Sequence, residues 1–246
     1  GTIATEPAAG QALAPRSLLH AACPTYRGAR HSARVAEAKA DAELLAAWRE
    51  GDARSGDELV RRHFRSVYRF FRAKVEGDID DLVQQTFLAC VEGQRRFRAE
   101  GSFRAYVLGI ARYKFLNYLR AKRGPHVDLD ALDRGELSIF EVTGSPSRIA
   151  AQREEQRILS MALRRLPLDL QIAVELFYWE EMSTQDIAQV LEIPRGTVKT
   201  RLMRGRKRLA ELVEELAGSA AVAEATLSDI ARWAMDLRAL SEEKVD

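Results

Sequence analysis

The segment from Ser183 to Leu202 constrains the fold most, because it predicts two helices joined by a tight turn. Ser183 is a suitable N-cap for a first helix over 184–191, and a three-residue turn that ends in proline follows. Ala188 supplies the small side chain that a crossing helix needs. Val198 and Leu202 are four residues apart, so they share one face of the second helix and can pack on the first. The pattern predicts a helix-turn-helix.

The second helix of this motif carries a dense run of positive charge. Between Arg195 and Arg208, seven residues are Arg or Lys and none is acidic. Once the apolar pair faces inward, the residues that point away from the core are Arg195, Lys199, Thr200 and Met203. A disordered basic tract and the solvated face of an ordinary helix are the alternatives. The turn and the inward pair favour a DNA-binding helix, whose N-terminal half contacts base edges while later basic residues contact phosphates.

Hydrophobic residues spaced three and four apart predict helices along most of the remaining chain. Glycines and prolines are few (15 and 7 of 246 residues) and β-branched runs are rare, so helix is favoured over strand. We expect an all-α protein with two small helical domains joined by an acidic flexible linker. The expected parts are a disordered leader (1–40), a four-helix N-terminal domain (41–123), the linker (124–151), a helix-turn-helix domain (152–218) and an acidic tail with a short helix (219–246). The leader's composition also fits an artefact of the assigned start or a transit peptide.

Composition and spacing argue against several classes of function. No apolar run reaches 18 residues, so no membrane insertion is expected. Cys23 and Cys90 have neither metal-ligand spacing nor a disulfide framework, which fits a reducing compartment. There is no phosphate-binding glycine loop, metal cluster or nucleophile–base pair among the residues, and His63 is expected at or near the surface. We therefore expect no enzymatic activity, no cofactor and no bound metal.

Residues 94–123 combine positive charge with aromatic side chains. Nine Arg or Lys residues accompany the single acid Glu100, and six aromatic residues are interleaved with them. This combination suits unpaired nucleic acid, because every base offers a face for stacking. The alternative is that the aromatic residues form the core. Core positions are expected for Phe97, Tyr113 and Phe115, whereas both roles are open for Phe103 and Tyr106.

Two separate parts of the chain resemble one known family. Asp-Leu-Val-Gln-Gln-Thr-Phe-Leu (81–88) and Phe-Arg-Ala-Glu-Gly-Ser-Phe-Arg-Ala-Tyr-Val-Leu-Gly-Ile-Ala-Arg (97–112) resemble region two of bacterial RNA polymerase sigma factors of the extracytoplasmic-function (ECF) group. Leu-Arg-Arg-Leu-Pro (163–167) and the helix-turn-helix resemble region four of the same group. The resemblance covers about residues 41–216 and joins two independent motifs in the expected order.

The resemblance implies a set of binding residues. Contacts to the clamp helices of the largest polymerase subunit fall on Asp80, Asp81, Gln84, Gln85 and Phe87. Capture and melting of the minus-ten promoter element fall on Arg98, Gly101, Ser102, Phe103, Tyr106, Arg112, Lys114, Asn117, Tyr118 and Arg120. Contacts to the minus-thirty-five element fall on Arg195, Thr197, Lys199, Thr200, Met203, Arg204 and Arg206.

The implied function is that of a sigma factor, which binds core RNA polymerase and promoter DNA in the cytoplasm and directs transcription initiation. The same resemblance implies contact with the flap of the second-largest subunit, a linker that passes near the RNA path, a monomer when free, and control by an anti-sigma factor. Tyr106 stands where the family often has Trp. The leader and the tail lie outside the shared part.

Other interpretations remain at this stage. The chain could be a helix-turn-helix regulator with an N-terminal partner-binding or sensory domain, or an adaptor whose N-terminal half binds only protein. The basic-aromatic block favours the sigma factor, since a protein that binds only duplex DNA does not need it. In the tail, an apolar stripe at helical spacing suggests a built-in regulator, or else a helix that packs on the second domain or frays; the stripe is Leu227, Ile230, Ala234 and Leu237.

Overall fold

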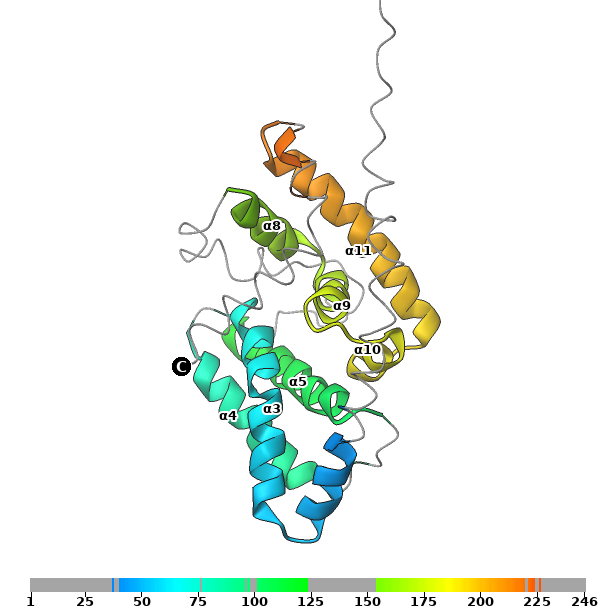
Figure 1. Ribbon diagram of the computed structural model, residues 1–246. Coiled ribbons are helices and arrows are strands. Elements are labelled where there is room, and N and C mark those ends of the chain that lie inside the picture. Colours follow the sequence, from blue (N-terminus) through cyan, green and yellow to red (C-terminus); the bar gives the residue numbers. More distant parts are fainter. Residues whose placement is uncertain are drawn as a thin grey trace, which may run out of the picture.

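The computed structural model describes residues 37, 40–75, 77–95, 97, 101–123, 154–219, 221–223 and 226. Within these residues the chain forms α-helices joined by short turns, without a β-strand, which confirms the expected all-α class (Figure 1). Most of the leader, the whole linker and the apolar stripe of the tail lie outside the described residues. The expectations for those segments stay predictions.

Four helices form the N-terminal group. A helix over residues 40–49 precedes α3 (Ala53–Arg72), α4 (Ile79–Gly93) and α5 (Phe103–Arg123). Asp52 caps α3 by accepting a hydrogen bond from the Arg54 N–H at 3.1 Å. Ser102 caps α5 in the same way, since its hydroxyl accepts from the Ala105 N–H at 3.1 Å. Both caps are short polar side chains directly before a helix, so local sequence is enough to place these two starts.

Four further helices form the C-terminal group. They are α8 (Glu154–Arg165), α9 (Leu168–Tyr178), α10 (Thr184–Leu191) and α11 (Arg195–Leu216). Gly205 lets α11 approach α9 closely, because a Cβ atom at this position would lie 2.7 Å from Val174 Cγ2. After α11 the chain folds back onto the C-terminal group, so that Ala223 and Thr226 are buried.

Apolar residues at helical spacing predict that Phe64 and Phe71 share the buried face of α3, but the buried face is rotated from that expectation. Phe64 is only half-buried, whereas Phe70 and His63 are buried. The surface or half-buried position expected for His63 is wrong: its side chain is 1% exposed, and Nε2 lies 2.7 Å from Asp41 Oδ2. A polar pair can occupy the core because each partner satisfies the other's hydrogen-bonding groups.

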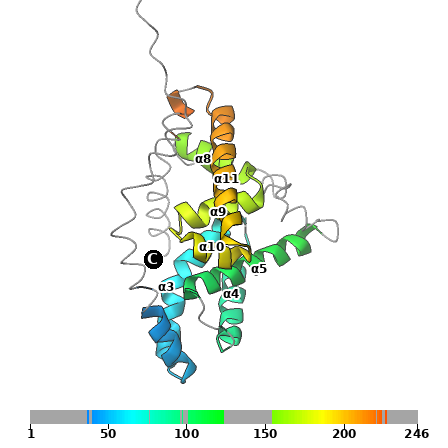
Figure 2. The same ribbon diagram turned by 90° about the vertical axis from the view of Figure 1, so that its right-hand side faces the viewer.

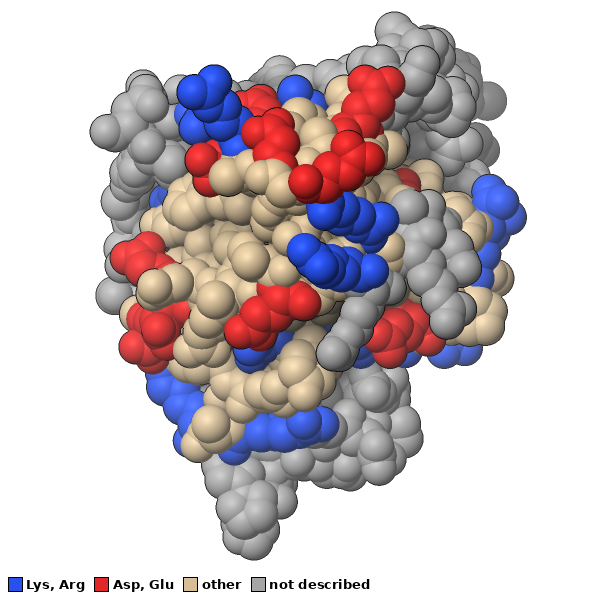
Figure 3. All heavy atoms as spheres, turned by 90° about the horizontal axis from the view of Figure 1, so that it is seen from below, with Lys and Arg blue, Asp and Glu red and all other residues tan. Residues whose placement is uncertain are grey.

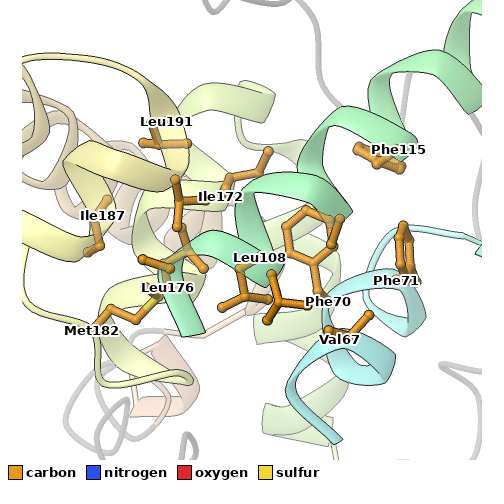
Figure 4. Packing of buried hydrophobic residues seen from close by; sticks show 14 of the residues in the cluster. Val67, Phe70, Phe71, Leu108, Phe115, Ile172, Leu176, Met182, Ile187 and Leu191 are labelled. Carbon is orange, nitrogen blue, oxygen red and sulfur yellow. The ribbon is translucent and has the colours of Figure 1, made fainter. Parts of the chain in front are cut away.

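One hydrophobic cluster joins the two groups of helices. Val67 and Phe70 of α3 and Leu108 of α5 belong to the same cluster as Ile172 of α9 and Ile187 of α10 (Figure 4). A second, smaller cluster lies among α8, α9, α11 and the turn that follows α11. In Figure 2, α10 lies between α11 and α5, which it contacts on opposite sides. The described parts of the two expected domains are therefore packed on each other through a shared core.

Candidate nucleic-acid interface

The helix-turn-helix is built as the sequence predicts. Ser183 caps α10, because its hydroxyl accepts the N–H of the third residue of the helix at 3.1 Å. The turn is closed by the Ile193 N–H, which donates to the Ala188 carbonyl at 3.1 Å. Val198 and Leu202 are both buried. Their burial fixes which face of α11 is turned outward.

The outer face of α11 presents polar and basic side chains. The exposed residues of its N-terminal half are Arg195, Thr197, Lys199, Thr200, Met203 and Arg204. Met203 is 62% exposed, so its apolar side chain is accessible on this face. Arg206 differs from them, since it is half-buried and its Nε donates to the Leu202 carbonyl at 3.1 Å. Arg201 turns inward to Asp169, with 3.1 Å between Nε and Oδ2. The basic residues of α11 are thus unequal, and only some of them are exposed.

The aromatic residues near the start of α5 divide between core and surface. Phe103 belongs to the core, because it is 3% exposed and its ring centroid lies 5.4 Å from that of His63. Tyr106 is half-buried and stacks on Phe97, with 4.5 Å between ring centroids. Phe97 thus packs against the core, and Phe115 is fully buried, as expected.

Tyr113 contradicts the expected core position, since it is 60% exposed. Ala111, Phe115 and Leu119 form the buried side of α5, and their four-residue spacing leaves Tyr113 on the other side of the helix. The remaining residues expected at the minus-ten element lie along the same helix with exposed or half-buried side chains: Arg112, Lys114, Asn117, Tyr118 and Arg120. Arg112 lies beside Asp169 and Leu191 of the C-terminal group, so the outer side of α5 combines the exposed Tyr113 ring with Lys114 and Arg120.

Arg49 holds the segment that leads into α5. Its Nε and Nη2 donate to the Gln94 carbonyl at 3.0 and 2.6 Å, and Nη2 also donates to the Phe97 carbonyl. Arg98 lies outside the described residues, directly after this anchor. Sequence reasoning missed Arg49, because its partners are backbone carbonyls more than 40 residues away and leave no pattern in the sequence.

The outer side of α4 carries most of the residues expected to bind polymerase. Asp80, Asp81, Gln84 and Gln85 are exposed, and Gln85 donates to Asp81 at 2.8 Å. Phe87 differs from the expectation, since it is 8% exposed and stacks at 6.2 Å on Phe64 of α3. Its ring joins α4 to α3 and offers little surface to a partner. Leu88, one residue further, is 57% exposed.

Comparisons with known proteins match the N-terminal and C-terminal groups of helices to two separate family models. Family models described as "Sigma-70 region 2" and "Sigma-70, region 4" match residues 59–124 and 156–209. The chain is 32% identical over 195 residues to the ECF RNA polymerase sigma factor SigM of Mycobacterium tuberculosis, covering 78% of this chain and 91% of the relative. It is 29% identical over 188 residues to an ECF sigma-E factor of Haemophilus influenzae, covering 74% of this chain and all of the relative.

The chain belongs to the ECF sigma factors. As a sigma factor it acts in transcription initiation. Its fold is also similar to chains in two solved complexes. One is the complex of CnrH with the cytosolic domain of CnrY, with a TM-score of 0.51 and 24% identity over 72% of this chain and 98% of the matched chain. The other is the complex of the sigma factor RpoE with the anti-sigma factor NepR from Bartonella quintana, with a TM-score of 0.50 and 22% identity over 64% of this chain and 96% of the matched chain. None of the described helices is long and apolar enough to cross a membrane.

In this sigma factor, region four lies against the entry to α5 of region two. The Ser102 hydroxyl donates to Asp186 of α10 at 3.0 Å. The side chain of Gln189 occupies the space that a Cβ atom at Gly101 would fill. Two residues expected to capture the minus-ten element are therefore in contact with the first helix of the helix-turn-helix, and both are half-buried.

Ion pairs reinforce this contact between the two regions. Glu180, in the turn before α10, accepts from Arg69 of α3 at 2.9 and 3.1 Å and from Arg104 of α5. Lys74 is fully buried beyond the end of α3, where it donates to the Phe70 carbonyl at 3.0 Å and to Glu175 of α9. These contacts satisfy groups that would otherwise be charged and buried without partners.

Electrostatics at the contact follow from burial and from these partners. Burial by itself would raise the pKa of Glu180, but Arg104 and Arg69 outweigh it and hold the pKa below its ordinary value. Burial raises the pKa of the Tyr106 hydroxyl to about 12, so this group stays neutral. Seen from the side of the N-terminal group, acidic and basic side chains surround a broad uncharged area (Figure 3).

Proposed function

We propose that this sigma factor binds core RNA polymerase through the outer side of α4 and places it on promoters through α5 and α11. The observation that carries the proposal is the outward face of α11, where Lys199, Met203 and Arg204 are exposed while Val198 and Leu202 anchor the helix. A helix held in this way can enter the major groove of a minus-thirty-five element. The cytoplasm, where the polymerase acts, is the proposed location.

Side chains near the start of α11 would contact base edges, and later ones would contact phosphates. Lys199 and Thr200 lie within the first two turns and are exposed, as base-edge contacts require. Arg204 lies one turn further, and Arg206 is held by its own helix, so both suit the sugar-phosphate backbone. Arg195 and Thr197, in the first turn of α11, belong to the same proposed DNA-binding surface.

The outer side of α5 would hold the unpaired strand of the minus-ten element. Lys114 and Arg120 supply positive charge along the helix, and Tyr118 and the newly placed Tyr113 supply rings for stacking. Arg112 borders α9 and would reach the strand only after the two regions separate. Phe103 and Tyr106 would act by shaping the preceding loop, because their rings are packed in or against the core. A base flipped from the duplex would be captured by that loop, which includes Arg98.

Opening of the contact between regions two and four would precede promoter melting. Gly101 and Ser102 contact α10 on one side and are half-buried, so a strand that surrounds them would have to displace α10. Binding to polymerase would supply the free energy of opening if the clamp helices and the flap of the second-largest subunit engage regions two and four at separated positions. An anti-sigma factor that favours the packed arrangement would keep the chain inactive.

Polymerase binding can be tested directly on α4. Core polymerase is titrated with labelled wild-type chain and with Gln84→Ala/Gln85→Ala, two changes at exposed positions that leave the core intact. We expect tight binding of the wild type and a loss of tenfold or more in the variant, since each lost hydrogen bond costs roughly 0.5–1.5 kcal/mol. Glu214→Ala, exposed on α11, is the matched control and should bind as the wild type does. Absence of binding by the wild type would refute the proposal.

A further inference from the structure

Region two holds the Glu180 carboxylate of region four in a site built from α3 and α5. Arg69 of α3 donates to both carboxylate oxygens, from Nε at 2.9 Å and from Nη2 at 3.1 Å. Arg104 of α5 donates to the same carboxylate through Nη2. The Nη2 groups of both arginines also donate to the Ser66 hydroxyl, at 3.3 and 3.2 Å. Three side chains of region two thus converge around one anionic group of region four.

The side chains that form this site all belong to region two. Ser66 and Arg69 are three residues apart on α3, so they share one face of that helix. Val67 of α3 and Leu108 of α5 are fully buried in one cluster, which sets the spacing between the two helices. The side chains of Arg69 and Arg104 are 15% and 21% exposed, beside a carboxylate that is 6% exposed. Withdrawal of region four would therefore open this anion site to solvent and leave its walls in place.

Arg104 has a donor that Glu180 leaves unused. Its Nε is buried, and among the described residues nothing accepts a hydrogen bond from it. A buried donor without a partner costs free energy, so a ligand with more acceptors suits the site better. A phosphodiester carries the same charge as a carboxylate, but it has four oxygens arranged as a tetrahedron where the carboxylate has two in a plane. The planar fork of arginine binds phosphate oxygens in pairs. The site therefore fits a phosphate better than the group that it holds.

The site lies beside the loop that the proposed function gives to the minus-ten element. Arg104 follows Ser102, the cap of α5, by two residues and belongs to the first turn of the helix. The first turn of a helix also directs N–H groups and the positive end of the helix dipole toward a nearby anion. A strand held at Gly101 and Ser102 would run past this turn, which brings the phosphate of a neighbouring nucleotide to Arg104 and Arg69. The unpaired promoter strand is thus the phosphate ligand that the position of the site favours.

We infer that Arg69, Arg104 and Ser66 form a phosphate-binding site for the unpaired minus-ten strand. Glu180 occupies this site while regions two and four are packed, with its carboxylate in the place of the phosphate. The strand and region four therefore compete for the same two arginines. Exchange of one singly charged anion for another leaves neither arginine without a partner. The inference rests on the proposed function, because the position of the strand is taken from it.

Binding of a labelled single strand by the full chain tests the site. The probe is a twelve-nucleotide oligothymidylate, whose affinity is measured at several salt concentrations. Glu180→Gln should bind it roughly tenfold more tightly than the wild type, because the competing carboxylate is gone. Adding Arg69→Gln/Arg104→Gln should remove this gain and reduce the slope of log affinity against log salt by about 0.7 in magnitude, the share of one phosphate. This background leaves no buried carboxylate unpaired. Arg54→Gln/Arg61→Gln, which removes two exposed arginines of α3 in the same background, is the control and should change the affinity less than twofold.

The uncharged methylphosphonate analogue of the same strand gives a second measurement, which needs only the wild type and Glu180→Gln. With this analogue the gain should fall below twofold, because the analogue presents the same bases without the negative charge that the two arginines bind.

Four results would overturn the inference: no gain in Glu180→Gln, a gain that persists without the two arginines, an equal gain for the analogue, or a larger gain for a hexaglutamate peptide, which would assign the site to carboxylates of a protein partner. Promoter-selective transcription by the full chain alongside any of these results contradicts the phosphate site alone. Absence of promoter-selective transcription contradicts the proposed function.

Discussion

Glu180 and Arg104 form an ion pair between the turn that precedes the helix-turn-helix and the first turn of α5. Arg69 of α3 also pairs with Glu180, with 2.9 Å between Arg69 Nε and Glu180 Oε1. Glu180 is almost fully buried, so its charge depends on both arginines. Together with the hydrophobic cluster of Figure 4, this arrangement keeps region four over the loop that leads into α5.

Glu180→Gln should weaken the contact between the two regions. The amide leaves two arginines without a negative partner, and loss of one member of a buried ion pair costs about 3 kcal/mol of unfolding free energy. Urea denaturation measures the loss. Glu211→Gln, which removes one of the two surface partners of Arg208, is the control and should cost less than about 1 kcal/mol. Equal stability of wild type and Glu180→Gln would show that the ion pair does not hold the regions together.

The contribution of Glu180 should also depend on pH. Its pKa in the folded chain is lowered below the ordinary value of 4.5, so the stabilisation is fully present above that pH and disappears as the pH falls through the folded pKa. The difference in unfolding free energy between wild type and Glu180→Gln should therefore be constant from neutral pH to pH ~5 and shrink below it. A difference that grows in acid would contradict the assigned direction.

The local features of the fold were predictable from sequence, and the contact between the regions was not. Ser183, Ala188 and the pair Val198 and Leu202 act within about 20 residues, where helical spacing and capping chemistry determine the outcome. Glu180 and Arg69 are 111 residues apart, and nothing in either neighbourhood marks them as partners. Long-range packing of this kind is decided by shape and charge in three dimensions.

The candidate site was also only partly predictable from the sequence. The outward face of α11 followed from the two inward residues Val198 and Leu202. Phe87, where the resemblance placed a polymerase contact, packs in the core, and so does Phe103, for which the sequence left both roles open. Periodicity alone misplaced Tyr113 as well, because the buried side of α5 is set by Ala111, Phe115 and Leu119. An aromatic residue can either pack in the core or contact a partner, and the sequence does not distinguish the two roles, whereas the packed structure does.

Arg49→Ala and Arg49→Lys should both impair promoter opening. Either change leaves the Gln94 and Phe97 carbonyls without the planar guanidinium that binds them, since lysine cannot reproduce its fork. Permanganate reactivity of unpaired thymines at the minus-ten element should fall, while binding of minus-thirty-five duplex DNA stays unchanged. Arg54→Ala, exposed at the start of α3, is the control. Normal opening by both Arg49 variants would exclude a role for this anchor.

Glu192→Gly should stabilise the protein. Glu192 adopts a left-handed conformation (φ 56°, ψ 40°) at the end of α10, which costs a non-glycine residue about 1–2 kcal/mol. Glycine removes that strain but loses more chain entropy on folding, so the expected net gain is about 0.5–1 kcal/mol. Thermal unfolding measures it. Glu214→Gly, the same change inside α11, should instead destabilise, and a loss of stability in both variants would contradict the strain at Glu192.

Transcription from a randomised promoter library, with core polymerase and the full chain, tests the central claim most directly. Wild type should select defined minus-thirty-five and minus-ten sequences. Lys199→Ala should relax the preference at about one position at a cost of roughly 1–3 kcal/mol, and Arg204→Ala should weaken all promoters alike and flatten the dependence on salt. Transcripts without sequence preference, or no transcripts at all, would contradict the account.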